Sequence, residues 1–250
     1  MPNPLIRDPV TQLAAEFGAG FIAPLGYIDG LQMVWNSATS VGVSTGACYI
    51  PSLGYALPFT SALTLSGLSL TASTWYHLYG YSNSGTPAIE LVTTAPATAY
   101  NGTARAKTGD TTRRYLGSLY SNSSSQIAQF TVVGNKFVYT NPNGNMVISN
   151  GTSITSTAVS CSTYAPITAT AGNFRFQNNT STTSANFGYL ASGGQTASSS
   201  NVVLAVGSAL AYSLSGYGDV AFDSSQNVAY SASSSSASLY LFVLGYYYGR

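Results

Sequence analysis

The stretch Trp75–Thr93, WYHLYGYSNSGTPAIELVT, carries the strongest fold signal in this chain of 250 residues. Two runs rich in aromatic and β-branched side chains flank Ser82-Asn83-Ser84-Gly85, and turn-forming residues between two such runs are typical of an antiparallel hairpin. We therefore expect one strand at Trp75–Tyr81 and its partner at Ala88–Thr93. The hairpin indicates an antiparallel β protein.

The same period-two pattern, interrupted by frequent turn residues, extends outward from this hairpin from about residue 30. A second hairpin is expected between Tyr115–Tyr120 and Gln126–Val133, and a new turn-rich passage begins near Asn135. The pattern predicts an all-β chain of short antiparallel strands.

We expect three parts in this chain. A short N-terminal arm covers residues 1–28, a β-sandwich-like module covers 29–134, and a second β domain covers 135–250. Both domains are predicted to be antiparallel, jelly-roll-like sandwiches. Two closely packed sheets that share one core are the alternative.

The composition argues for a folded structural protein. Apolar residues make up 45% of the chain and aromatic residues 12%, but charged residues make up only 6%, against roughly 25% in an average soluble domain. Many aromatic residues with little charge argue against disorder. The net charge of +1 argues against a nucleic-acid-binding protein.

The N-terminal arm can form two helical turns, with Asp8 as the cap and Pro9 as the first helical residue. So short a helix is marginal in water and needs a surface to lie against. We expect it to attach the chain to a partner protein, with packing on its own domain as the alternative. The apolar residues of the arm are Leu5, Ile6, Val10, Leu13 and Phe17.

No apolar run has the length of a targeting or spanning segment. The N-terminus lacks the apolar stretch of a signal peptide, and the longest run, Leu239–Tyr248, is about half of what a spanning helix needs. We expect a protein made in the cytoplasm, without membrane insertion. Cys48 and Cys161 match no metal spacing, so we expect two buried thiols, with a disulfide as the alternative, and neither metal nor cofactor.

The last predicted strand is apolar on both faces, because all six residues of Leu239–Leu244 are apolar or aromatic. A strand of this kind is buried on both faces, and a neighbouring subunit can supply the second layer. We expect a homotrimer, while the terminal tyrosines could instead form an exposed contact patch. The interface candidates are Tyr240, Phe242, Leu244, Tyr246, Tyr247 and Tyr248.

Several segments, in this order, resemble a module found in tail-fibre and other appendage proteins of tailed bacteriophages. They are Asp29–Ser40, Thr45–Ile50, Ala62–Leu68, Thr74–Tyr79 and Lys107–Ser118, and the ending Leu244–Tyr248 is similar to one that those proteins use. The resemblance covers roughly residues 29–133 and the last strand.

The resemblance implies a structural protein of the virion, often trimeric, that contacts other proteins of the tail, collar or capsid. The first hypothesis is a tail fibre or spike that adheres to a host surface glycan through residues 135–238, which match nothing in the module. The alternative is a capsid or collar decoration or connector protein, which would dock through the N-terminal arm.

Two clusters in the first domain are candidate glycan contacts. Trp75, His77, Tyr79 and Tyr81 share one face of the predicted strand, and aromatic rings of this kind can stack on sugars. The other interpretation, which we favour, places this face in the core or in a subunit interface.

The second cluster is basic. Arg105, Lys107, Arg113 and Arg114 hold half of the eight positive charges and surround Asp110. Guanidinium groups can bind a phosphate or an acidic sugar through paired hydrogen bonds. The structural interpretation, which we favour, pairs Asp110 with an arginine and lets the other side chains donate to carbonyls at a subunit interface.

The chain offers little for catalysis. Asp219 and Asp223 are the only carboxylates close together in the later half, and a polysaccharide depolymerase, the second alternative, would need such a pair. Turn-forming roles suit both residues equally well. We therefore expect a protein that is not an enzyme.

Overall fold

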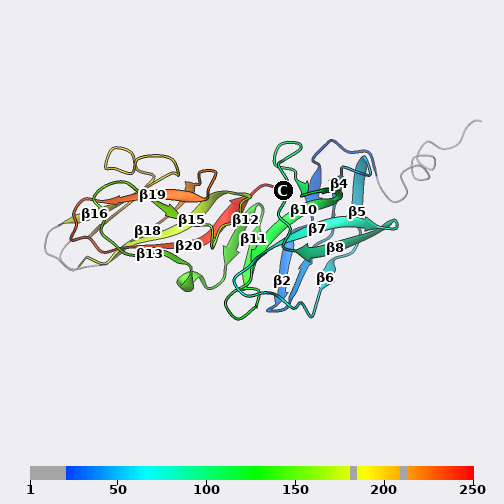
Figure 1. Ribbon diagram of the computed structural model, residues 1–250, viewed down its shortest axis with the longest axis horizontal. Helices are drawn as coiled ribbons and strands as arrows, with labels where there is room; N and C mark the ends of the chain where they lie inside the picture. Colours follow the sequence, from blue (N-terminus) through cyan, green and yellow to red (C-terminus); the bar gives the residue numbers. More distant parts are fainter. Residues whose placement is uncertain (1–20, 181–184, 209–212) are drawn as a thin grey trace, which may run out of the picture. The chain divides into compact units, whose positions relative to one another are not determined.

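The computed structural model describes residues 21–180, 185–208 and 213–250. The chain divides into two compact units: unit 1 comprises the residues up to Ala128 together with Arg250, and unit 2 comprises Gln129–Gly249. Within the described residues, every element is a β-strand except one 3-10 turn, η1 (Pro142–Gly144), and all strand pairs are antiparallel (Figure 1). The predicted all-β antiparallel class is confirmed.

The N-terminal arm cannot be compared with its prediction. Its apolar residues, Leu5, Ile6, Val10, Leu13 and Phe17, lie outside the described residues. In the part of the chain that the structure describes, no helix has the length and apolar character needed to cross a bilayer.

Unit 1 contains three antiparallel sheets. Its strands are β1 (Ile28–Gly30), β2 (Met33–Ser37), β3 (Ser40–Val43), β4 (Gly46–Ile50), β5 (Tyr55–Phe59), β6 (Leu63–Leu65), β7 (Trp75–Asn83), β8 (Thr86–Val92), β9 (Ala106–Lys107) and β10 (Asp110–Tyr120). The sheet orders are β1-β4-β5, β2-β3-β6 and β8-β7-β10-β9. The core includes Leu31, Ile50, Phe59, Leu78 and Leu116, each at most 1% exposed.

The predicted hairpin in Trp75–Thr93 is confirmed. β7 pairs with β8 from His77 opposite Val92 to Asn83 opposite Thr86. Ser84 and Gly85 form the two-residue turn, with φ of 51° and 88°. Two consecutive residues in the left-handed region match the twist of the flanking strands, so local turn chemistry sets this register.

The second predicted hairpin forms only as an isolated antiparallel bridge near its turn, with Ser121 opposite Ile127. The predicted strand Tyr115–Tyr120 pairs instead with β7, where Tyr115 lies opposite Tyr79, and β9 pairs with β10 at Asp110 and Arg114. The next strand, β11 (Phe130–Val133), pairs instead with β12 (Lys136–Tyr139). The units divide between Ala128 and Gln129, before β11, whereas the boundary expected at residue 134 falls in the turn between β11 and β12.

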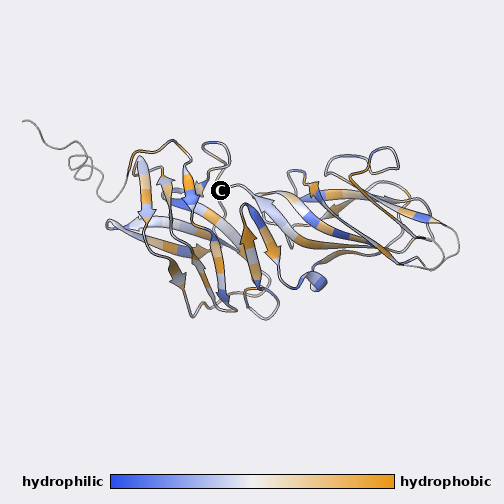
Figure 2. Cartoon of the chain, turned by 180° about the vertical axis from the view of Figure 1, so that it is seen from behind, coloured by the Kyte–Doolittle hydropathy of each residue, from blue (hydrophilic) through white to orange (hydrophobic). Residues whose placement is uncertain are grey.

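Unit 2 is a two-layer sandwich. Its other strands are β13 (Met146–Gly151), β14 (Thr157–Ser160), β15 (Ala169–Asn178), β16 (Asn186–Ala191), β17 (Leu204–Ser208), β18 (Leu214–Ala221), β19 (Asn227–Ala232) and β20 (Leu239–Tyr248). The larger sheet has the order β11-β12-β20-β15-β18, with β13 also on β20, and the smaller sheet has the order β14-β19-β16-β17. Blue and orange segments alternate along several of these strands (Figure 2).

The two layers touch closely at Gly188 of β16. A Cβ atom there would lie 2.7 Å from Leu239 Cδ2 and 2.8 Å from Phe176 Cζ. Glycine at this position therefore lets the smaller sheet pack directly on β15 and β20, in the middle of the larger sheet.

The inner face of β20 changes partway along the strand. Leu239, Leu241 and Val243 are fully buried, but the register with β15 shifts between Asn173 and Phe174, and after this irregularity Tyr246 is buried as well. Tyr246 stacks on Phe137, with ring centroids 4.7 Å apart. The bulge thus shifts the alternation by one residue, so that even-numbered residues face the core at the end of β20.

The trimer-interface candidates consequently separate into two groups. Tyr246 and Tyr248 are 0% and 1% exposed inside unit 2 itself, and Phe242 is also buried. Tyr240, Leu244 and Tyr247 are half-buried and reach the outer face of the larger sheet.

Cys48 and Cys161 are both buried free thiols, as the sequence indicates. Burial raises the pKa of each thiol to about 12. Both side chains are therefore protonated at neutral pH and serve as small apolar groups.

Candidate functional site

The basic cluster in unit 1 is largely engaged in internal ion pairs. Lys107 Nζ lies 2.7 Å from Glu90 Oε1 and 3.6 Å from Asp110 Oδ2. Arg113 Nε lies 3.2 Å from the same Glu90 oxygen, and its guanidinium lies over the ring of Tyr81 at 3.8 Å. Asp110 thus pairs with a lysine and not with an arginine.

The other two arginines of this cluster hold backbone carbonyls. Arg105 Nη1 donates to the Ala97 carbonyl at 3.0 Å. Arg114 is 0% exposed and donates through Nη2 to Gly26 at 3.1 Å and through Nη1 to Arg105 at 3.4 Å. Burial lowers the pKa of Arg114. These contacts match the carbonyl-capping part of the structural interpretation.

The aromatic face of β7 is mostly internal. His77 and Tyr79 are 4% and 0% exposed. Trp75 and Tyr81 are half-buried, with Trp75 against the ring of Tyr120 at 5.2 Å. Within unit 1, the two central members of this stripe are therefore closed to any ligand.

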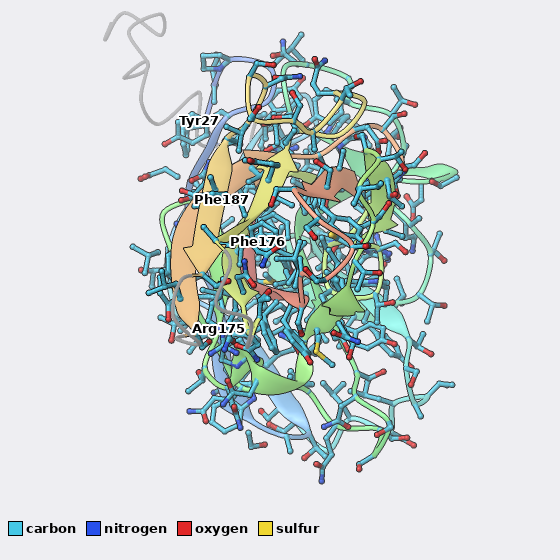
Figure 3. All side chains as sticks on the ribbon, turned by 90° about the vertical axis from the view of Figure 1, so that its left-hand side faces the viewer. Tyr27, Arg175, Phe176 and Phe187 are labelled. Atoms are coloured by element: carbon cyan, nitrogen blue, oxygen red, sulfur yellow. The ribbon has the colours of Figure 1, made fainter. Side chains whose placement is uncertain are left out.

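A different set of side chains lies on the outer face of the larger sheet of unit 2. In β15, Phe174 and Phe176 are buried between the sheets, whereas Asn173, Arg175 and Gln177 alternate with them and are half-buried on the opposite side. Figure 3 labels the neighbours Arg175 and Phe176, which point in opposite directions from β15.

Arg175 lies in the middle of a row that crosses the sheet. It stands opposite Tyr217 of β18 on one side and opposite Phe242 of β20 on the other. Its guanidinium carbon is 4.0 Å from the centroid of the Phe242 ring. Tyr217 is 64% exposed, whereas Phe242 is buried. The guanidinium group of Arg175 therefore has an exposed aromatic ring on one side and packs on a buried ring on the other.

Arg175 has few partners among the described residues. Nη1 donates to the side-chain oxygen of Asn143 in η1 at 3.5 Å, and the buried Nε has no hydrogen-bond partner. No carboxylate of a described residue lies within 4.0 Å of this guanidinium. The positive charge is positioned but not neutralised.

Asp219, which follows Tyr217 by two residues on β18, already has partners of its own. Asn173 Nδ2 donates to its Oδ1 at 2.6 Å and the Tyr247 hydroxyl donates to its Oδ2 at 2.7 Å. Lys136 Nζ lies 3.7 Å from Oδ1. Asp219 therefore orders its neighbours on the same face and leaves Arg175 without a counter-ion.

Asp223, the second carboxylate considered for catalysis, closes a turn. Its Oδ1 accepts from the backbone N–H groups of Ser225 at 2.8 Å and Asn227 at 2.9 Å. These hydrogen bonds, chiefly that from Asn227, lower the pKa of Asp223. A general acid at neutral pH needs the opposite shift.

Unit 2 also has a shallow hollow of about 490 Å³ between β13 and β14. Small polar residues such as Ser149, Asn150 and Ser160 line it, together with Tyr230, and no charged side chain does. It lacks both an exposed aromatic platform and a charged anchor, so the Arg175 row is the stronger candidate.

The sequence reasoning missed Arg175 and Tyr217. Arg175 stands alone in its segment, without the clustering that drew attention to residues 105–114. The alternation Asn173-Phe174-Arg175-Phe176-Gln177 is the signal that could have placed three polar side chains on one open face.

In the described ranges, no group of three His, Cys, Asp or Glu side chains is arranged to hold a metal ion. No protein-family model and no curated protein sequence matches the chain. The function must therefore be argued from the site and from the resemblance of residues 29–133 and the last strand.

Proposed function

We propose that this chain is a non-enzymatic adhesion protein of a tailed-bacteriophage particle, a homotrimeric tail fibre or spike that binds a glycan on the host surface. The proposal combines the resemblance of residues 29–133 to phage appendage modules with the chemistry of unit 2. Its site is the outer face of β15, β18 and β20.

The observation that carries the proposal is the row formed by Tyr217, Arg175 and Phe242. Sugars present apolar C–H faces beside hydroxyl groups, so they bind best where an exposed aromatic ring lies beside planar hydrogen-bonding side chains. Tyr217 supplies the ring at 64% exposure, and Asn173 and Gln177 flank Arg175 on the same face of β15. Their amide nitrogens donate to Asp219 and to Asn179 and Ser213, so these two side chains would offer their amide oxygens to sugar hydroxyls.

A flat site of this kind binds one sugar chain weakly, and a trimer compensates for that. Three linked sites raise the overall affinity by roughly 10²-fold or more when they engage one surface together. Adhesion without an enclosed pocket is consistent with this mode of binding.

The direct test is binding of the labelled full chain to receptive bacteria, together with competition against infection. Tyr217→Ala should reduce both, because it removes the exposed ring. The matched control is Phe187→Ala, which removes a 43% exposed ring from the smaller sheet (Figure 3). If the unaltered chain neither binds cells nor blocks infection, a purely structural role in the capsid or collar replaces the adhesion proposal.

A further inference from the structure

We infer that the Arg175 face of unit 2 recognises a carboxylate-bearing sugar residue in a surface polysaccharide, with Arg175 holding the carboxylate and Tyr217 the sugar ring. The inference rests on the proposed adhesion function and adds the chemical class of the ligand.

The first argument comes from how the cations of the described residues are used. Three of them, Lys107, Arg113 and Lys136, lie within ion-pair distance of a carboxylate. Three others, Arg105, Arg114 and Arg250, donate to backbone carbonyls. Arg175 does neither, and its Nη1 donates only to the side-chain amide oxygen of Asn143, at 3.5 Å, among the described residues.

The second argument is that the guanidinium is held in place before any ligand arrives. The side chain lies over Phe242 at 4.0 Å, and Asn143 contacts it from η1. A fixed guanidinium loses little conformational freedom on binding, and its two terminal nitrogens match the two oxygens of a carboxylate.

The neighbours of Arg175 favour a sugar acid over a polyphosphate. A ligand dense in phosphate needs several free cations in a row. The other cation on this face, Lys136, already lies 3.7 Å from Asp219. One guanidinium beside an exposed ring and two amides instead fits a single carboxylate on an otherwise neutral ring.

A second copy of the chain is a poorer occupant. Among the described acidic side chains, Glu90, Asp110 and Asp219 are paired with cations and Asp223 accepts backbone N–H groups, whereas the exposed Asp29 has no ion pair. A neighbouring copy therefore offers few free acids to Arg175.

The test uses the full chain and a panel of acidic bacterial polysaccharides, each presented in its native form and after reduction of its carboxyl groups to alcohols. Binding is measured by biolayer interferometry for the unaltered chain and for Arg175→Gln, Arg175→Lys, Tyr217→Ala and Lys136→Gln. Light scattering and thermal melting verify that each variant keeps the mass and fold of the unaltered chain.

Carboxyl reduction should weaken binding of the unaltered chain by about 10- to 100-fold, as expected for a charge-assisted pair. Arg175→Gln should cause a similar loss and should no longer distinguish native from reduced polymer. Arg175→Lys keeps the charge but loses the paired geometry, so its affinity for the native polymer should lie between those of the unaltered chain and Arg175→Gln. Lys136→Gln, which removes the same charge from the same face, should change binding by less than about threefold.

Three results would overturn the inference. Binding that ignores both carboxyl reduction and Arg175→Gln leaves adhesion intact but excludes a carboxylate ligand. A change of molecular mass in the folded Arg175 variants identifies the face as a contact between copies. Failure of the unaltered chain to bind any polysaccharide or receptive cell removes the adhesion function together with the inference.

Discussion

His77 lies in a polar chain inside unit 1. Its Nδ1 is 2.7 Å from Ser118 Oγ, and that oxygen is 2.8 Å from the Tyr115 hydroxyl. Because the ring is 4% exposed, protonating it would place a charge in the core without a carboxylate nearby to balance it. Protonation of this histidine therefore destabilises the folded state of unit 1.

The first prediction concerns this histidine. Burial lowers the pKa of His77 from 6.5 to about 4. The unfolded chain binds the proton first, so stability that is present above the unfolded pKa is lost as the pH falls toward the folded pKa. The free energy of unfolding of unit 1, measured with urea, should fall by up to about 3 kcal/mol as the pH is lowered from 6.5 to 4.

His77→Gln serves as the control for that prediction. The variant is less stable at neutral pH if its amide fits poorly, but its stability should vary less over the same pH range. An unchanged pH dependence in the variant would assign the effect to other groups.

The second prediction concerns Arg114, a fully buried cation that donates to the Gly26 and Arg105 carbonyls and pairs with no carboxylate of the described residues. Arg114→Ala removes the donor to the Gly26 carbonyl and opens a cavity, whereas the Arg105 carbonyl keeps the Tyr115 N–H at 2.9 Å. The free energy of unfolding of unit 1 should therefore fall by about 3 kcal/mol. Arg113→Ala removes the adjacent, partly exposed side chain and should cost about 1 kcal/mol or less. Equal losses in chemical unfolding would mean that Arg114 contributes no more than a surface ion pair.

At the scale of elements, local signals could be predicted from the sequence and long-range pairing could not. The β7–β8 hairpin could be predicted because the turn-forming residues Ser84 and Gly85 lie between its two strands. The partner of β10 was not, because Tyr79 lies far from Tyr115 in the sequence and nothing in the intervening residues specifies that pairing.

The candidate site was harder to predict for the same reason. Arg175, Tyr217 and Phe242 come from three strands and meet only through the register of the larger sheet. Conversely, the clustered arginines at 105–114 were prominent in the sequence, and their nearby acids and carbonyls satisfy them in the folded unit. The cationic residues that lie close together in the sequence thus form a structural network, whereas Arg175, whose charge is not paired, has no cationic neighbour in the sequence.

The third prediction tests the bulge in β20. A Cβ atom on Gly245 would lie 2.1 Å from the Phe137 carbonyl oxygen, so Gly245→Ala cannot fit without separating β20 from β12. The free energy of unfolding of unit 2, measured with denaturant, should fall by about 2 kcal/mol, which is the usual cost of overpacking. Gly144→Ala, in η1 with open space around the site, is the matched control and should change stability little. Tolerance of Gly245→Ala would mean that the strand ends readily move apart.

At the scale of the whole molecule, the fourth prediction concerns assembly. The resemblance of residues 29–133 and of the last strand to phage appendage modules implies three copies. Multi-angle light scattering should give three times the chain mass of 25.9 kDa at micromolar concentration. A mass of one chain across the accessible concentration range would remove the trimer and the multivalent part of the adhesion mechanism.

The sealed cysteines make the chain a convenient object for optical measurements. Since Cys48 and Cys161 are both 0% exposed, maleimide dyes should leave the native chain unlabelled. A new cysteine at an exposed serine would then be the single point of attachment, without prior removal of the natural ones. Ser124→Cys in unit 1 and Ser199→Cys in unit 2 offer one such point in each unit. Energy transfer between the two dyes would follow the separation of the units as the polysaccharides of the binding panel are added.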